Sequence, residues 1–187
     1  MNFLSKYNNS KNIRFESFYF TLNLCKKNNF KNIVETGTSR GKKKFFFFNK
    51  YNWKDGMSTI MFAEYVKFFN GRLYTCDISS KNINAAKKFT KEYSRYISYF
   101  IEDSISFLKN FSNSIDLLYL DSLDGHNPVI ASEHQLNEVR VAIDKLHEKS
   151  LILLDDKGSK TNLSIDYLLK SKFKIIFETN FQVLLSK

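Results

Sequence analysis

The end of the chain carries the pattern that limits its fold most. Two apolar segments, 173–178 and 181–186, are separated only by Thr179-Asn180. A two-residue connection is too short for a parallel crossover, so these segments must form an antiparallel hairpin. Upstream of it, strand-like and helix-like segments alternate, which is typical of right-handed βαβ units and a parallel sheet. The chain is therefore expected to end a parallel sheet with an antiparallel hairpin.

The other elements follow from apolar periodicity and from short apolar runs. Together they predict an α/β fold, a doubly wound sheet of about seven strands that is parallel except for the C-terminal hairpin, with helices on both faces. The predicted strands are 32–36, 72–78, 96–101, 115–120 and 150–154, and the predicted helices are 14–28, 57–69, 80–94, 104–110, 131–148 and 161–171.

The size of the chain fits a single domain over residues 1–187 with an N-terminal helical segment over 1–30, because 187 residues of which 43% are hydrophobic can bury one core. No signal-peptide pattern is present, and no apolar stretch reaches about 18 residues. We therefore expect a soluble, cytoplasmic protein.

A formal net charge of +10 has two readings. It could mark an anionic partner such as nucleic acid. The other reading is a composition rich in Lys, Asn, Ile, Phe and Tyr, as an AT-rich genome would give. The lysines are spread along the chain and not gathered on one helix, which favours this second reading.

Acidic residues follow the predicted strands at the point where each ends. Ligands of open α/β sheets bind outside the carboxyl ends of the strands, so acids gathered there indicate a binding site. The alternative is that some of them only cap helices. The acids are Glu35, Asp77, Asp103, Asp121 and the pair Asp155-Asp156.

The segment from Glu35 to Gly41 resembles the first motif of the class I methyltransferases, whose Rossmann-like sheet also ends in an antiparallel strand. A second segment, Gly56-Met57-Ser58-Thr59, resembles the Gly-x-Ser-Thr that usually follows this motif almost at once. The resemblance covers roughly residues 30–187. It implies S-adenosylmethionine as the cofactor and an enzyme that transfers its methyl group.

The same resemblance assigns roles to the strand-end acids. An acid at the position of Asp77 accepts from the ribose hydroxyls, and an Asp-Ser at Asp103-Ser104 binds the adenine. The helix that starts near Ser58 offers free N–H groups to the methionine carboxylate. The predicted cofactor-binding residues are Glu35, Gly37, Thr38, Ser39, Ser58, Thr59, Asp77, Ile78, Asp103, Ser104 and Asp121.

Three acids could converge where the fourth and fifth strands end. Asp121, Asp155 and Asp156 offer hard oxygen ligands suited to Mg²⁺ or another divalent cation. The arrangement is similar to that of metal-dependent, macrocin-type sugar O-methyltransferases. That likeness implies a general base just past Asp121, for which Asp124 is the candidate and His126 the rival. The alternative is that the Asp pair only makes a turn before Gly158.

Residues 39–55 form an apparent insertion between the two parts of the first motif. They hold Arg40, a run of three lysines at 42–44, four phenylalanines, Tyr51 and Trp53. The insertion is either a lid or substrate wall that attracts an anionic group, or an aromatic plug or oligomer contact.

The predicted function is S-adenosylmethionine-dependent O-methylation of a hydroxyl on a sugar or other small molecule, assisted by a divalent cation. A metal-bound hydroxyl loses its proton more readily, and a nearby base takes it. The alternatives are an RNA methyltransferase, or an inactive methyltransferase-like binding protein. Two roles are open for the N-terminal helix: it covers the rim of the sheet, or it mediates a homodimer.

Overall fold

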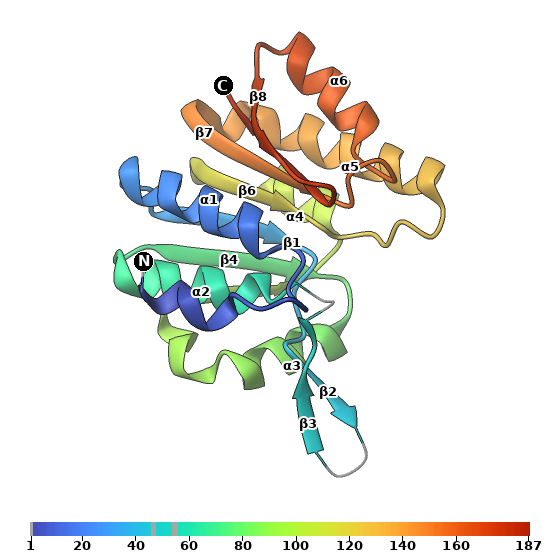
Figure 1. The fold of residues 1–187 in the computed structure, drawn as a ribbon. Coiled ribbons are helices and arrows are strands. Elements are labelled where there is room, and N and C mark those ends of the chain that lie inside the picture. Colours follow the sequence, from blue (N-terminus) through green and yellow to red (C-terminus); the bar gives the residue numbers. More distant parts are fainter. Residues whose placement is uncertain (1, 46–47, 54–55) are drawn as a thin grey trace.

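One seven-stranded sheet forms the centre of the molecule (Figure 1). The computed structural model describes residues 2–45, 48–53 and 56–187, and of residues 2, 42–45 and 48–50 it describes the backbone only. The strands are β1 (Asn32–Thr36), β4 (Arg72–Asp77), β5 (Ile97–Ile101), β6 (Ile115–Leu120), β7 (Leu146–Asp155), β8 (Lys174–Glu178) and β9 (Gln182–Ser186).

The helices surround this sheet on both faces. No helix of the described residues is long and apolar enough to cross a membrane. The helices are α1 (Phe15–Lys27), α2 (Ser58–Phe68), α3 (Ser80–Phe89), α4 (Ser104–Asn110), α5 (Pro128–Ala142) and α6 (Asn162–Lys170), with short 3₁₀ segments η1 (Asn2–Tyr7), η3 (Lys91–Tyr96) and η4 (Ile143–Lys145).

The sheet topology confirms the fold predicted from the sequence. The strand order is β5-β4-β1-β6-β7-β9-β8, and β9 runs antiparallel to both of its neighbours, β7 and β8. The other neighbouring strands pair in parallel. The order reverses beside β1, so the carboxyl ends of β1, β4 and β6 meet where such sheets bind ligands.

Alternation along the strands divides the core in two. Successive residues point to opposite faces of a sheet, so neighbours enter different clusters. Ile33 packs with residues of α1 and α2 on one face, whereas Val34 packs with α4 and α5 on the other. The two cysteines, Cys25 and Cys76, are buried and unpaired, one in each cluster.

Two predicted helices are wrong at their C-terminal ends. The helix predicted over 80–94 ends at Phe89, where the Thr90 hydroxyl bonds the carbonyl of Ala86, and a 3₁₀ turn follows. The helix predicted over 131–148 ends at Ala142, and residues from 146 already belong to β7. His147 therefore lies in a strand, where its ring contacts Asp116 at 2.8 Å, and not at a solvated helix end.

The insertion over 39–55 contains a small antiparallel hairpin outside the main sheet. It pairs β2 (Lys42–Phe45) with β3 (Phe48–Tyr51) and projects away from the body of the molecule (Figure 1). Phe46 and Phe47 lie outside the described residues, as do the side chains of the three lysines. Tyr51 and Trp53 are described, and their rings contact each other with centroids 5.5 Å apart.

Candidate active site

The turn after β1 is pressed against the loop after β6. Gly37 has a φ of +82°, a conformation that other residues rarely adopt, and its N–H donates to the carbonyl of Cys76. A Cβ atom on Gly37 would lie 2.0 Å from the carbonyl oxygen of Asp121. Only glycine fits at this position, which fixes the spacing between two loops of the site.

Glu35 joins the two halves of the predicted first motif. Its fully buried carboxylate accepts hydrogen bonds from the hydroxyls of Ser58 at 2.5 Å, Thr59 at 2.8 Å and Thr75 at 2.6 Å. The Thr59 hydroxyl also accepts from the backbone N–H of Ser39 at 2.8 Å. The segments around Glu35 and Ser58 therefore meet although the insertion separates them in sequence.

These contacts place several predicted cofactor residues inside the protein. Thr38 is buried and shares a 2.7 Å hydrogen bond with Thr75. Helix α2 begins after Met57, which has a left-handed backbone and provides no side-chain cap. The buried hydroxyls of Thr38, Ser58 and Thr59 position the loop and the start of this helix, and a direct contact with the cofactor stays a prediction for them.

The end of β4 presents an acid beside an exposed apolar side chain. The Asp77 carboxylate accepts from the backbone N–H of Ser79 at 2.8 Å and from the Asn82 side chain at 3.0 Å, so it is held at the start of α3. Ile78 is 75% exposed. An exposed isoleucine next to a fixed carboxylate is the pair of surfaces that a nucleoside needs, since the ring stacks and the ribose hydroxyls donate.

The end of β5 places Asp103 and Ser104, the residues predicted to bind the adenine, at the start of α4. Asp103 caps α4 by accepting from the N–H of Ser106 at 3.0 Å, and it is half-buried. Ser104 is buried and its hydroxyl lies 2.9 Å from Nε2 of His134 on α5. Asp103 therefore has the helix-cap role that was the alternative for these acids, whereas α3 is capped by Ser79 and not by Asp77.

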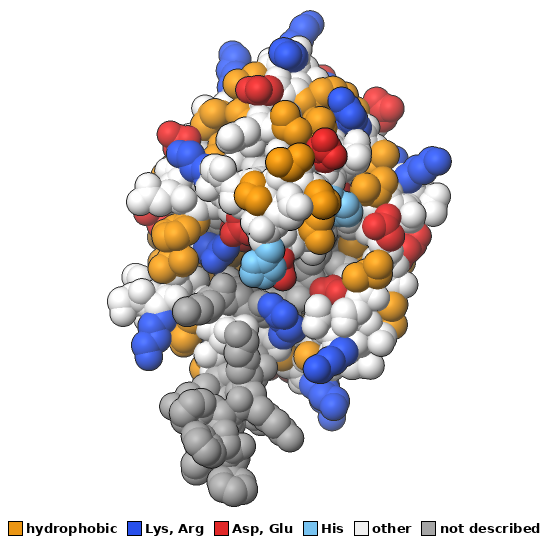
Figure 2. All heavy atoms as spheres, turned by 90° about the vertical axis from the view of Figure 1, so that its right-hand side faces the viewer, with side chains coloured by type: hydrophobic (Ala, Val, Ile, Leu, Met, Phe, Trp, Pro, Cys, Tyr) orange, Lys and Arg blue, Asp and Glu red, His pale blue; other side chains and the backbone are white. Residues whose placement is uncertain are grey.

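The three acids predicted to bind metal do come together. One carboxylate oxygen from each of Asp121, Asp155 and Asp156 lies within 4.8 Å of the others. Figure 2 views the molecule from the side toward which the parallel strands of Figure 1 point, and both acidic and histidine side chains are exposed on that face.

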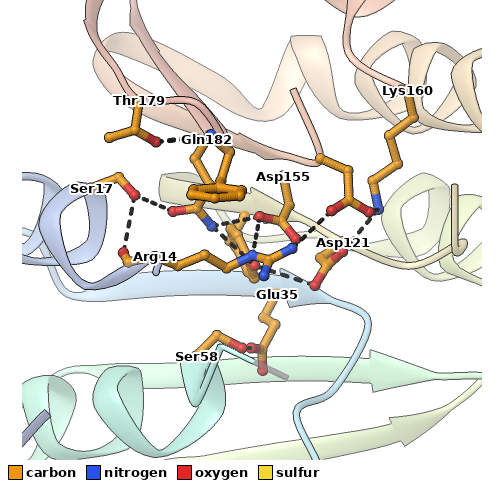
Figure 3. Close-up of polar contacts among 12 residues, drawn as sticks. Arg14, Ser17, Glu35, Ser58, Asp121, Asp155, Lys160, Thr179 and Gln182 are labelled. Carbon is orange, nitrogen blue, oxygen red and sulfur yellow. Dashed lines mark hydrogen bonds and ion pairs between the residues drawn. The ribbon is translucent and has the colours of Figure 1, made fainter. Parts of the chain in front are cut away.

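Two cations from the chain already occupy this cluster (Figure 3). Arg14 donates to Asp155 at 2.6 Å and to Asp156 at 2.8 Å. The ammonium of Lys160 lies 2.8 Å from Asp121 and 3.2 Å from Asp156. Each of the three carboxylates thus has a cationic partner.

The protonation states follow from burial and from these charges. Burial raises the pKa of Asp121 well above its usual value, the nearby Asp155 raises it further, and Lys160 opposes both. Burial alone would lower the pKa of Lys160, but Asp121 and Asp156 raise it above its usual value, so this lysine is charged. Burial acts against Arg14 too, yet its bond to Asp155 raises its pKa.

The fit of a divalent ion to these acids is therefore poor in this arrangement. The donor chemistry suits Mg²⁺, and one atom, the buried Asp155 Oδ2, accepts no hydrogen bond among the described residues. Against it, an ion coordinated by the three acids would have to displace Arg14 and Lys160, or lie beside two positive charges.

The candidate bases lie on the loop that follows Asp121. Asp124 and His126 are exposed, and within the described ranges neither side chain makes a hydrogen bond or an ion pair. Lys157, on the loop after β7, pairs with Glu178 at 2.9 Å. The two bases are thus free to meet a substrate, and their assignment stays a prediction.

Three residues that contact the acidic cluster belong to no sequence motif. Arg14 lies 141 positions from Asp155, and Gln182 on β9 donates to the same Asp155 oxygen at 2.8 Å. Of the three, only Lys160 is close in sequence to an acid that it contacts, because it stands four positions after Asp156. The sequence could predict the acids from the strand ends, whereas their partners come from elements brought together only by the fold.

A larger cavity of about 700 Å³ lies between the insertion, α2 and α3. Its walls are aromatic and charged: Tyr7, Tyr51, Trp53 and Phe89 with Lys6, Arg40, Lys88, Glu64 and Glu92. The described end of the insertion therefore forms one wall of this cavity. Both of its predicted roles stay predictions.

Comparison with known proteins assigns the family. A family model described as "Methyltransferase domain" matches residues 53–157, more than half of the chain, and the chain belongs to this family. The fold is that of the class I S-adenosylmethionine-dependent methyltransferases. No curated protein matches the sequence.

Solved methyltransferases share the fold at low sequence identity. The SAH-bound methyltransferase PaMTH1 of Podospora anserina is 13% identical with a TM-score of 0.67, covering 97% of this chain and 80% of that one. An rRNA methylase of Streptococcus thermophilus is 11% identical, with a TM-score of 0.65 and coverage of 96% and 99%. The O-methyltransferase NovP is 11% identical, with a TM-score of 0.66 and coverage of 93% and 79%.

Proposed function

We propose that this protein is an S-adenosylmethionine-dependent methyltransferase that methylates a hydroxyl on a sugar or another small molecule. The observation that carries the cofactor is the edge formed by Gly37, Asp77, Ile78 and Asp103, which combines a tight turn, two fixed acids and an exposed apolar side chain. Such a surface suits a nucleoside without a pyrophosphate. Membership of the methyltransferase-domain family supports the same cofactor.

The acceptor chemistry is proposed from the loop after β6. A hydroxyl is a poor nucleophile until a base removes its proton, and Asp124 and His126 are exposed and unengaged among the described residues. The cofactor supplies a methyl group activated by its positive sulfur. The protein's part is then to align the hydroxyl with that methyl and to accept the proton.

The alternative is that a divalent metal ion assists the same reaction, and a single atom supports it. The buried, unpartnered Asp155 Oδ2 is a ligand position that a divalent cation could take. The contacts of Arg14 and Lys160 favour the metal-free version, in which these two side chains balance the acids.

RNA methylation is the second candidate. The net charge of +10 favours it, and one structural neighbour is named an rRNA methylase. Transfer of a labelled methyl group from S-adenosylmethionine to a panel of sugars, phenols and RNA separates these acceptors. Calorimetric titration with S-adenosylhomocysteine is the first test, and no binding would contradict both enzyme versions and leave an inactive binding protein.

The Ile78 side chain offers a clean test of the cofactor site. We expect Ile78→Ser to weaken S-adenosylhomocysteine binding about tenfold, because a side chain that stacks on the adenine loses part of ~1.5–3 kcal/mol of burial energy. The melting temperature should hardly change, since the residue is exposed. Ile175→Ser, on the exposed part of β8, is the matched control and should bind normally. If both variants bound S-adenosylhomocysteine equally well, the adenine would not stack on Ile78.

The two candidate bases are separated by a pair of variants. We expect one of Asp124→Asn and His126→Gln to lower kcat by roughly 10²–10⁴-fold on the best acceptor of the panel, as loss of a general base does. Both should bind S-adenosylhomocysteine as the wild type does, because neither side chain contributes a described contact to the fold. Full turnover by both variants would show that the base lies elsewhere.

A further inference from the structure

We infer that Arg14 and Lys160 are built-in cations that take the place of a divalent ion at the carboxylate cluster of Asp121, Asp155 and Asp156, and that Lys160 also positions the loop that carries the candidate bases. The first half rests on the geometry of the cluster alone. The second half rests on the proposed function, because it concerns the loop assigned to the acceptor.

Lys160 has the contacts of a fixed ion and not of a mobile surface lysine. It is 1% exposed, and its ammonium lies within 3.2 Å of three oxygens: Asp121 at 2.8 Å, the carbonyl of Leu123 at 3.0 Å and Asp156 at 3.2 Å. An ammonium group has three N–H donors, so these three acceptors use all of them. Lys160 therefore joins the ends of β6 and β7 as a metal ion would, through oxygen ligands from both.

Arg14 fills the other side of the cluster. It comes from the segment just before α1, and it bonds Asp155 and Asp156 through different nitrogens. Around it, Gln182 donates to Asp155 and to the Tyr119 hydroxyl, and the Ser17 hydroxyl bonds Gln182 (Figure 3). Gln182 is fully buried, so its hydrogen bonds with Ser17, Tyr119 and Asp155 hold Asp155 in place against Arg14.

The contact with Leu123 links the cluster to the proposed chemistry. The Leu123 carbonyl is one residue before Asp124 and three before His126, on a loop with no regular structure. A bond from a buried ammonium to this carbonyl restrains the backbone from which both candidate bases extend. Lys160 is thus a positioning residue. Its three N–H donors are all used within the protein, so it has none left to bind the molecule that receives the methyl group.

The test measures metal binding and needs no acceptor. Mn²⁺ is titrated into the full chain, and free Mn²⁺ is followed by electron paramagnetic resonance. We expect no binding by the wild type at millimolar metal. Lys160→Met removes the ammonium with little change of volume and leaves three carboxylates with one cation, so this variant should bind Mn²⁺. Addition of Asp121→Asn should abolish that binding.

Lys157→Met is the matched control, because Lys157 lies in the same segment but pairs with Glu178 away from the three acids. It should bind no Mn²⁺. Hydrogen exchange gives a second readout: the loop over 121–127 should exchange faster in Lys160→Met, and Mn²⁺ should slow it again in that variant only. Rescue by the metal would not follow if the lysine only filled space.

Two results would overturn the inference. One is stoichiometric Mn²⁺ binding by the wild type that is lost in Asp155→Asn, which would make the cluster a metal site. The other is a folded Lys160→Met that binds no Mn²⁺. If this variant does not fold, the wild-type titration decides alone. Calorimetry with S-adenosylhomocysteine on the same wild-type sample shows separately whether the proposed function holds.

Discussion

Replacing Gly37 by alanine is expected to abolish S-adenosylhomocysteine binding and to lower the free energy of unfolding by about 3–5 kcal/mol. Two costs add: a left-handed backbone at a residue with a side chain, and a Cβ placed 2.0 Å from the Asp121 carbonyl oxygen. Both backbones are held by hydrogen bonds just past the strands, from Gly37 N–H to the Cys76 carbonyl and from Asp121 N–H to the Thr36 carbonyl, so neither can move away cheaply. Denaturant unfolding and calorimetry measure the two effects.

Gly158→Ala is the matched control for this prediction. Gly158 has the same φ of +82°, but a Cβ there would meet no atom within 4 Å. It should cost only about 1–2 kcal/mol, the price of the backbone conformation, and leave cofactor binding intact. If the two variants were equally stable, the close approach of the loops after β1 and β6 would not constrain the residue at position 37.

The second large effect is expected at Glu35. Glu35→Ala removes the acceptor of three buried hydroxyls at once, and each hydrogen bond to a charged group contributes about 1.5–3 kcal/mol. Since the bonds are coupled, we expect a total loss of about 3–5 kcal/mol, together with weaker cofactor binding because α2 loses its tether to β1.

The matched variant Glu35→Gln keeps the volume and one acceptor oxygen. It should lose less than half as much stability as the alanine variant, as measured by thermal and urea unfolding. Thr75→Val removes one of the three donors and should cost about 1–2 kcal/mol. An alanine variant as stable as the glutamine variant would mean that the three hydroxyls find other partners.

The strand ends were predictable because each is marked locally. An apolar run that stops at an acid, as at Asp77 or Asp121, gives both the element and the edge on which the acid lies. The topology followed from one short connection, since Thr179-Asn180 excludes a crossover. These signals span a few residues and need no knowledge of tertiary contacts.

The limits of the prediction have a physical cause as well. The change from helix to strand at Leu146 was missed because Ile143 and Leu146 are apolar and three positions apart, which is helical spacing. In the structure, pairing of Leu146 with Ile115 overrides that preference. The charges that surround the acids were missed because Arg14 reaches them from the opposite end of the sequence. Acids at a strand end indicate a cationic partner without telling whether it is a metal or a side chain.

The position of β9 also bears on the order in which the chain can fold. β9 lies between β7 and β8 and pairs with both, so β8 has no place in the sheet until residues 182–186 arrive. Until β9 has been synthesised, the edge of β7 that pairs with it is unpaired, and an unpaired strand edge can pair with another chain. Gln182, the first residue of β9, also bonds Asp155, so the carboxylate cluster is completed in the same late step that closes the sheet.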